Sequence, residues 1–281
     1  MSYWYTKGEL SDSIPVNDRG AQYGDGLFET IAIRDAKPRL WDFHVERLSL
    51  GCSRLGLHVP DEHLLRSELQ DALDHRQIDT HRAVAKIVVS AVSESRGYQR
   101  AESWPLLIRV GLFASEELSP DLYRNGIATR LCQTRIALQP SLAGIKSLNR
   151  LEQVLARSEW HDPSVFEGLM LDTDNRLICG TMSNVFLCNG NSVLTPAITR
   201  CGVSGVMRRQ ILAALTQAER PFEVRDIEAT ELKLADEVFV SNSQFGVLPV
   251  RRVDSTRYTP GPVTKNVMQL LVQDGITECS L

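Results

Sequence analysis

The feature that most constrains the fold is a series of short apolar segments in the second half of the chain, separated by Gly- and Asn-containing turns. Four segments follow one another closely: EGLMLD (167–172), RLICGTM (176–182), NVFLC (184–188) and SVLTP (192–196). A repeated βαβ unit needs a crossover helix between successive strands, and these connections are too short to hold one. We therefore expect a mixed or barrel-like sheet here.

The first half of the chain combines strands with helices. LFETIAI (27–33) alternates as a strand does, and apolar residues from Trp41 to Leu55 then recur at helical spacing. The other face of that helix carries His44, Arg47 and Arg54. The pattern also predicts helices at 61–78, 148–160, 205–219 and 262–273, a loop at 138–147, and strands at 83–92, 105–114, 127–137, 222–227, 237–242 and 246–253.

These elements predict an α/β protein of the α+β kind with two domains. Residues 1–114 would form a small N-terminal α+β domain, and 127–281 a larger C-terminal domain with a mixed, barrel-like sheet. The polar segment 115–126, SEELSPDLYRNG, contains Pro120 and Gly126 and is the predicted linker.

The composition of the 281-residue chain is that of a soluble globular protein, with 43% hydrophobic and 23% charged residues. Its net charge of -4 argues against nucleic acid as the main partner, because phosphate binding favours a basic surface. No apolar run is long enough for a membrane span, and MSYWYTKGEL does not resemble a signal peptide. The six cysteines form no C-x-x-C pair, so we predict free thiols in the cytoplasm and no metal site.

Lysine is informative because the chain has only six, namely Lys7, Lys37, Lys86, Lys146, Lys233 and Lys265. Lys146 follows LAGI before a predicted helix. A lysine desolvated by apolar neighbours can lose its charge and form a Schiff base with a carbonyl, but on local chemistry alone a solvated lysine near a helix start is the favoured interpretation. Lys86 lies inside the apolar run AVAKIVVSAV, where the simpler interpretation is a strand lysine that points to solvent.

Five motifs, in order along nearly the whole chain, resemble those of one enzyme family. They are RGAQYGDGLFET (19–30), HVERL (44–48), AGIKSLNRLEQVL (143–155), CGVSGVMRR (201–209) and EVFVSNSQFGVLPV (237–250). Together they resemble the fold type IV pyridoxal-phosphate enzymes, also called the branched-chain aminotransferase family. The continuation Arg150-Leu151-Glu152-Gln153 is similar to the lyases of this family, whereas the D-amino-acid aminotransferases share K-S-L-N and then differ.

The resemblance implies pyridoxal 5'-phosphate as the cofactor and assigns residues to it. Lys146 would hold the cofactor as a Schiff base, with Asn149 of the same motif close by. The phosphate would be held by Arg47, whose guanidinium offers a fork of donors, and by backbone N–H groups at a helix start. The remaining cofactor residues implied are Gly205, Val206, Met207 and the hydroxyl of Ser243.

The resemblance also implies residues that line the substrate side of the site, and for several of them a purely structural role remains open. Tyr23, Phe28 and Thr30 would line it, although Phe28 fits a core position about equally well. The R-G-Y loop with Arg96 and Tyr98 is similar to a loop of the lyases that suggests recognition of a substrate carboxylate. A solvated loop arginine is the competing interpretation of Arg96. Arg150 is the second candidate for the carboxylate.

Two positions depart from the family pattern. Cys179 in RLICGTMSNVF stands where the family places a glutamate against the pyridine nitrogen of the cofactor, and a thiol makes at best a weak hydrogen bond. Glu167, Asp172 and Asp174 are near in sequence, but strand alternation does not favour them as substitutes. The other departure is Ala91, where the family usually has an arginine.

The activity implied is a lyase reaction in which 4-amino-4-deoxychorismate loses pyruvate to give 4-aminobenzoate for folate biosynthesis. A D-amino-acid or branched-chain aminotransferase, or a member that has lost activity, are the alternatives. Cys179 favours a lyase, because a transaminase depends more on a protonated ring that stores electrons. The family also implies a homodimer, acting on a small-molecule substrate.

Overall fold

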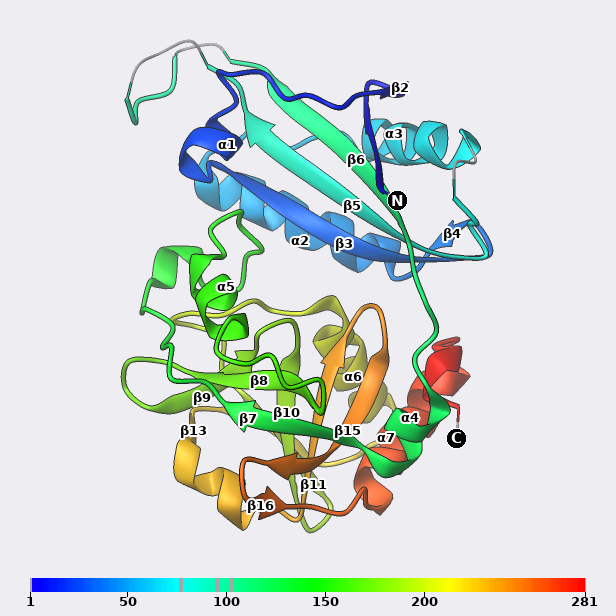
Figure 1. Cartoon of the computed structure of the whole chain (residues 1–281), viewed down its shortest axis with the longest axis vertical. Coiled ribbons are helices and arrows are strands. Elements are labelled where there is room, and N and C mark those ends of the chain that lie inside the picture. Colours follow the sequence, from blue (N-terminus) through cyan, green and yellow to red (C-terminus); the bar gives the residue numbers. More distant parts are fainter. Residues whose placement is uncertain (1, 76–77, 94–96, 102–103, 281) are drawn as a thin grey trace. The chain divides into compact units, whose positions relative to one another are not determined.

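The computed structural model describes residues 2–75, 78–93, 97–101 and 104–280. The chain divides into two compact units (Figure 1). Unit 1 contains the chain up to Glu117 together with Ile145–Asn149. Unit 2 contains Leu118–Gly144 and Arg150–Leu281. Arg96 of the predicted carboxylate loop lies outside the described residues.

Unit 1 is an antiparallel sheet with strand order β2-β1-β6-β5-β3-β4. Its strands are β1 (Ser2–Thr6), β2 (Glu9–Leu10), β3 (Gly26–Arg34), β4 (Lys37–Pro38), β5 (Arg82–Ala91) and β6 (Leu106–Ala114). Its helices are α1 (Arg19–Tyr23), α2 (Trp41–Leu55) and α3 (Glu62–Asp74). The predicted strands and helices of this region are confirmed, apart from shifts of a few residues at their ends.

Helices α2 and α3 pack on the same face of this sheet. Gly51 of α2 lies against Leu27 of β3, and Tyr5 of β1 lies next to His75 at the end of α3. Leu27 and Tyr5 share a face, because directly opposed residues in paired strands point to the same side and successive residues alternate. The core of unit 1 therefore lies between this face and the two helices.

Ile145–Asn149 belongs to unit 1 because it runs along the start of β3. The Phe28 N–H donates to the carbonyl of Lys146 at 2.9 Å, and the Leu148 N–H donates to the carbonyl of Gly26 at 3.0 Å. Ser147 is opposite Leu27 in an antiparallel bridge. The helix predicted from residue 148 starts only at Leu151, because these residues use their backbone groups to pair with β3.

Unit 2 contains a mixed sheet, as predicted, with the order β12-β11-β10-β14-β15-β7-β8-β9-β13 and β16 beside β15. The strands are β7 (Ile127–Leu131), β8 (Val165–Leu171), β9 (Arg176–Gly180), β10 (Asn184–Asn189), β11 (Ser192–Pro196), β12 (Phe222–Arg225), β13 (Ile227–Glu228), β14 (Glu237–Asn242), β15 (Gly246–Val253) and β16 (Thr256–Arg257). The two ends of this order, β12 and β13, are separated in sequence only by Asp226. The sheet thus curls round on itself, which is the barrel-like form expected.

The helical elements of unit 2 are α4 (Pro120–Asn125), η1 (Pro140–Leu142), α5 (Leu151–Arg157), α6 (Val206–Gln217), η2 (Ala229–Leu234), α7 (Pro262–Gln273) and η3 (Thr277–Cys279). Pro120 and Gly126, which suggested a linker, start and end α4. The predicted strand 127–137 ends at Leu131. Beyond it, the N–H groups of Gln133 and Thr134 donate to the Glu159 carboxylate.

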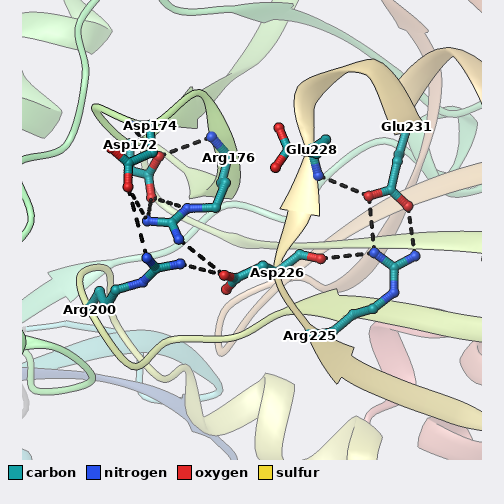
Figure 2. A network of polar contacts seen from close by, with 8 residues as sticks. All are labelled: Asp172, Asp174, Arg176, Arg200, Arg225, Asp226, Glu228 and Glu231. Carbon is teal, nitrogen blue, oxygen red and sulfur yellow. Dashed lines mark hydrogen bonds and ion pairs between the residues drawn. The ribbon is translucent and has the colours of Figure 1, made fainter.

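A network of ion pairs lies at the junction of β12 and β13 (Figure 2). Asp226 accepts from Arg176 at 3.0 Å and also binds Arg200, while its carbonyl accepts from Arg225 at 2.8 Å. Arg176 is also bound to Asp172 and Asp174 of the β8–β9 turn. The network therefore ties that turn and the segment before Cys201 to the point where the sheet closes.

In the part of the chain that the structure describes, none of the helices is long and apolar enough to cross a membrane.

Candidate active site

Lys146 is held by a backbone that has little freedom. Ile145 and Ser147 on either side are fully buried, and the segment pairs with β3 through the two hydrogen bonds given above. Since Ser147 is opposite Leu27, the Lys146 side chain projects to the other face of the sheet, where its Nζ lies 4.4 Å from the centre of the Phe28 ring. The structure therefore brings together two residues predicted for the site, one for the cofactor and one for the substrate.

Arg47 belongs to a buried cluster with Glu29 and His44. Its Nε donates to Glu29 Oε1 at 2.8 Å and its Nη2 contacts Oε2, while His44 Nδ1 lies 2.6 Å from the same Oε2. Glu29 is 2% and His44 1% exposed. The expectation that His44 and Arg47 lie on the outer face of α2 is therefore wrong for both, and holds only for Arg54.

The cluster fixes the charges of its members. Burial alone raises the pKa of Glu29, but Arg47 and His44 outweigh it and hold that pKa at about 2. Burial is also the largest influence on His44 and lowers its pKa, although Glu29 opposes the shift. At neutral pH, Glu29 is thus ionised and accepts hydrogen bonds from Arg47 and from a neutral His44.

Sequence reasoning missed Glu29 and the role of His44, although a signal was present. Glu29 alternates with Leu27 and Ile31, which are both buried, so it lies on the core face of β3. A carboxylate at such a position needs a partner, because an unpaired buried charge is strongly disfavoured. His44 and Arg47 are three residues apart on one helix and so face the same way.

In unit 2, the start of α6 leaves little room for a side chain at Gly205. A Cβ placed on Gly205 would lie 2.0 Å from Oδ1 of Asn184, whose Nδ2 donates to the Val203 carbonyl at 2.9 Å. Val206 and Met207, the first residues of the helix, are buried. Such a helix start presents unpaired N–H groups and suits a phosphate.

Ser243 lies in the turn between β14 and β15. Asn242 Oδ1 shapes this turn by accepting from the N–H groups of Gln244 and Phe245, at 2.9 and 3.0 Å. Asn242 Nδ2 donates to the Met182 carbonyl at 3.3 Å, which ties the turn to the loop after β9. The predicted hydroxyl ligand is thus placed by side-chain contacts within unit 2.

Cys179 is packed mainly against apolar side chains and other thiols. It is opposite Met170 in the β8–β9 pair and belongs to a buried cluster with Cys132, Ala156 and Cys201. Burial raises the pKa of its thiol far above the ordinary value, so the thiol is neutral. Arg150, at the start of α5, interacts electrostatically with Cys179, and burial lowers the pKa of this guanidinium.

None of the three nearby carboxylates is available to replace the missing glutamate. Glu167 is fully buried and accepts from the Thr181 N–H at 3.0 Å and the Ser183 hydroxyl at 2.7 Å. Asp172 and Asp174 are bound to Arg176. The contacts of all three side chains therefore agree with the expectation that none of them replaces the glutamate.

The other predicted substrate residues divide between two places in unit 1. Phe28 and Thr30 are half-buried on the sheet face that carries the Lys146 side chain. Tyr23 and Tyr98 meet edge to face, with ring centres 5.6 Å apart, in an open cavity of about 560 Å³ that Arg100, Trp104 and Asn149 also line. Asn149 Nδ2 donates to the Gly24 carbonyl at 3.2 Å, so its position is set by that turn.

No cluster of His, Cys, Asp or Glu side chains suited to a metal ion is found among the described residues.

Comparison with known proteins agrees with the fold and with the motifs. Residues 26–253 match the family described as amino-transferase class IV. An aminodeoxychorismate lyase of Vibrio harveyi is 32% identical over 252 residues, which are 90% of this chain and 92% of that protein. A D-alanine aminotransferase of Bacillus licheniformis is 26% identical over 95% of this chain and 93% of its own length.

Among solved structures, that of 4-amino-4-deoxychorismate lyase from Pseudomonas aeruginosa is similar, with a TM-score of 0.89 and 40% sequence identity. The match covers 97% of this chain and 99% of the other. These matches confirm the resemblance, the fold class and pyridoxal 5'-phosphate as the cofactor. The chain is an enzyme that belongs to the class IV aminotransferase family, the fold type IV pyridoxal-phosphate enzymes.

Proposed function

We propose that the chain is a 4-amino-4-deoxychorismate lyase, which releases pyruvate from its substrate and leaves 4-aminobenzoate for folate biosynthesis. The observation that carries the proposal is the segment around Lys146, because it combines a lysine fixed on the sheet face beside Phe28 with the lyase-like continuation Arg150-Leu151-Glu152-Gln153. The similarity to lyases of Vibrio harveyi and Pseudomonas aeruginosa supports it.

Within unit 1, Lys146 is near enough to the Arg47 cluster to lower the pKa of His44, so both can serve one cofactor, whereas the start of α6 belongs to unit 2. Lys146 would bind the cofactor covalently, Arg47 would contact its phosphate as part of the Glu29 cluster, and the start of α6 at Gly205 would add backbone donors. When bound, pyridoxal phosphate supplies a ring that withdraws electrons from the carbon bearing the substrate amine. The fit is poorest at Cys179, whose neutral thiol lies among apolar side chains.

Lys146 would be the group that moves the proton. Its amine would remove the proton from C4 of the substrate. The bond between C3 and the ether oxygen then breaks, and the leaving enolpyruvate takes up a proton to become pyruvate. The ring becomes aromatic in the same step, so this reaction demands less electron storage than transamination does, which is consistent with a thiol at Cys179.

The test uses the purified protein loaded with pyridoxal phosphate and supplied with 4-amino-4-deoxychorismate. We expect 4-aminobenzoate and pyruvate in equal amounts, with no product from Lys146→Ala. Borohydride should fix the cofactor to the peptide that contains Lys146. Transfer of the amino group of D-alanine to 2-oxoglutarate without formation of 4-aminobenzoate would favour the aminotransferase alternative. A protein that cannot be loaded with cofactor would point to a member that has lost activity.

We also infer that the chain acts as a homodimer in the cytoplasm. Leu151, Val154 and Leu155 on α5 are 76%, 57% and 61% exposed and recur at helical spacing, which gives an apolar stripe that a second copy can cover. Light scattering should give the mass of a dimer, and Leu155→Glu should shift it towards a monomer. A wild-type protein that is monomeric at micromolar concentration would contradict this inference.

A further inference from the structure

The two faces of the unit 1 sheet differ in burial. Along β3, Leu27, Glu29 and Ile31 are buried on the face that packs against α2 and α3, whereas Phe28 and Thr30 between them are half-buried. Because successive residues of a strand point to opposite sides, Phe28 and Thr30 lie on the face away from these helices. This is also the face that receives the Lys146 side chain.

Strands β5 and β6 add two cationic residues to the same face. Lys86 is directly opposite Thr30 in β3, and Arg109 of β6 is opposite Val88, which in turn is opposite Phe28. Directly opposed residues in antiparallel strands share a face, so Lys86 and Arg109 accompany Phe28 and Thr30. Lys86 therefore lies on the face away from the core helices, as expected for a strand lysine that points to solvent, but its side chain is half-buried and contacts the Phe28 ring.

One aromatic ring is shared by both lysines. Lys86 Nζ lies 4.8 Å from the centre of the Phe28 ring, and Lys146 Nζ lies 4.4 Å from the same centre. Each distance is within the range of a cation–π contact. The two ammonium groups thus contact the same ring, one on the lysine proposed to bind the cofactor and one with no function assigned so far.

Lys86 and Arg109 differ in whether a carboxylate pairs with their charge. Arg109 is bound to the buried carboxylate of Asp18 at 3.0 Å. Lys86 is half-buried, and within residues 2–75, 78–93, 97–101 and 104–280 no carboxylate pairs with it. Burial, helped by Arg109, lowers the pKa of Lys86. An anion bound beside Lys86 would compensate its charge and favour the ammonium form.

We propose that Lys86 binds the carboxylate of the enolpyruvyl group of the substrate and so selects for the lyase substrate. The inference rests on the proposed function. The substrate amine would lie near Lys146, and the enolpyruvyl ether is on the adjacent ring carbon, so its carboxylate can fold back towards the second cation at the Phe28 ring. The ring carboxylate is para to the amine and is held away from it by the rigid ring. Lys86 holds the leaving group and takes no part in proton transfer.

The test separates the two carboxylates by binding without turnover. Chorismate has both carboxylates and a hydroxyl in place of the amine, whereas 4-aminobenzoate has only the ring carboxylate. Their dissociation constants are measured by calorimetry on the cofactor-loaded wild type, Lys86→Met and Lys86→Arg, with Lys37→Met as the matched control at an exposed lysine of the same sheet. Cofactor loading is checked in every variant from its absorbance.

We expect Lys86→Met to bind chorismate about 10- to 100-fold more weakly, the loss typical of one charge-assisted contact, and to bind 4-aminobenzoate as the wild type does. Lys86→Arg should keep most of the affinity, and Lys37→Met all of it. In turnover, Lys86→Met should raise KM for 4-amino-4-deoxychorismate. If Lys86→Met does not fold, Lys86→Gln provides the same comparison.

If Lys86→Met binds chorismate as tightly as the wild type does, the inference about Lys86 is overturned. The proposed function still stands in that case, provided that the wild type forms 4-aminobenzoate. An equal loss for both ligands would also overturn the inference, because Lys86 would then contact the ring carboxylate. Absence of 4-aminobenzoate from the wild type would overturn the proposed function instead. This last result comes from a separate assay and cannot be confused with the binding measurements.

Discussion

The two units surround their predicted cofactor residues with opposite environments. In unit 1, Arg47 is part of a buried cluster of charged and polar groups with Glu29 and His44. In unit 2, Cys179 is packed among thiols and apolar side chains, and the carboxylates near it in sequence are committed to other partners. With the proposed cofactor contacts, the phosphate would lie beside charged side chains, whereas the pyridine nitrogen would lie beside a neutral thiol.

The comparison predicts the largest effect for Glu29→Gln. This change leaves Arg47 and His44 without the carboxylate that both contact, and breaking a buried ion pair typically costs about 3–5 kcal/mol. We expect a loss of that size in the free energy of unfolding, measured with urea at pH 7. Glu9→Gln, at an exposed glutamate of the same unit, is the control and should change little.

The same residue gives a pH dependence. The pKa of Glu29 is about 2 in the folded protein against an ordinary value of 4.5, so the folded state resists protonation. Its contribution is complete above pH 4.5 and is lost as the pH falls towards 2. Wild type should therefore lose stability over this window by roughly 3 kcal/mol more than Glu29→Gln does. Parallel pH profiles for the two proteins would contradict the assignment.

The next effect concerns Cys179→Glu, which places a carboxyl group in the apolar cluster. Burying a polar group without partners costs about 1–3 kcal/mol, and we expect such a loss in the protein without cofactor. If Cys179 faces the pyridine nitrogen, pyridoxal phosphate should restore the stability, and transamination of D-alanine should rise relative to the lyase rate. Both follow because a carboxylate keeps the ring nitrogen protonated.

The control for this prediction is Cys132→Glu, which is also buried in the same cluster but is not predicted to contact the cofactor. Cofactor should not rescue it. Equal rescue of both variants, or of neither, would mean that Cys179 is an ordinary buried thiol and that another group faces the nitrogen.

Arg47→Ala tests, by its effect on cofactor affinity, whether the charged cluster of unit 1 binds the phosphate. Loss of a charge-assisted contact to phosphate, worth about 1.5–3 kcal/mol, should weaken cofactor binding by roughly 10- to 100-fold. Fluorescence titration of the protein without cofactor measures this affinity. Arg54→Ala, exposed on the same helix, should bind as the wild type does. If Arg47→Ala loses only stability, Arg47 serves Glu29 alone.

Much of the fold was predictable, because alternation and helical spacing report burial directly. β3, α2, β5 and α7 begin and end within a few residues of their predicted positions. The pairing of Ile145–Asn149 with β3 was not predictable, since it joins segments more than 100 residues apart that carry no shared pattern. That pairing is what shortened the predicted helix at 148–160.

The sequence predicted those residues of the candidate site that belong to a motif. It did not predict the residues that only tertiary contacts bring to the site. The resemblance pointed to Lys146 and Arg47, yet it could not tell that Arg47 is held by Glu29 or that Lys86 shares the Phe28 ring. A lysine in an apolar strand is compatible with either face of the sheet. Only the register of β3, β5 and β6 decides which face it takes.

The smallest effect is expected in the exposed network of unit 2 around Asp226 (Figure 2). Asp226 and Arg200 are about half and 38% exposed, so solvent and salt weaken their attraction. Asp226→Asn should lower the free energy of unfolding by about 0.2–1 kcal/mol at low salt and by less in 0.5 M NaCl, as measured with urea. Glu223→Gln, which removes a single exposed partner of Arg225, is the matched control, and its effect should be no larger.

The Asp172–Arg176 pair next to the network stays intact in both variants, and it is nearly buried. A loss above 2 kcal/mol that salt does not reduce would mean that the junction of β12 and β13 depends on Asp226 as unit 1 depends on Glu29. The contrast between the charged surroundings of Arg47 and the surroundings of Cys179 would then not extend to the stability of the two units.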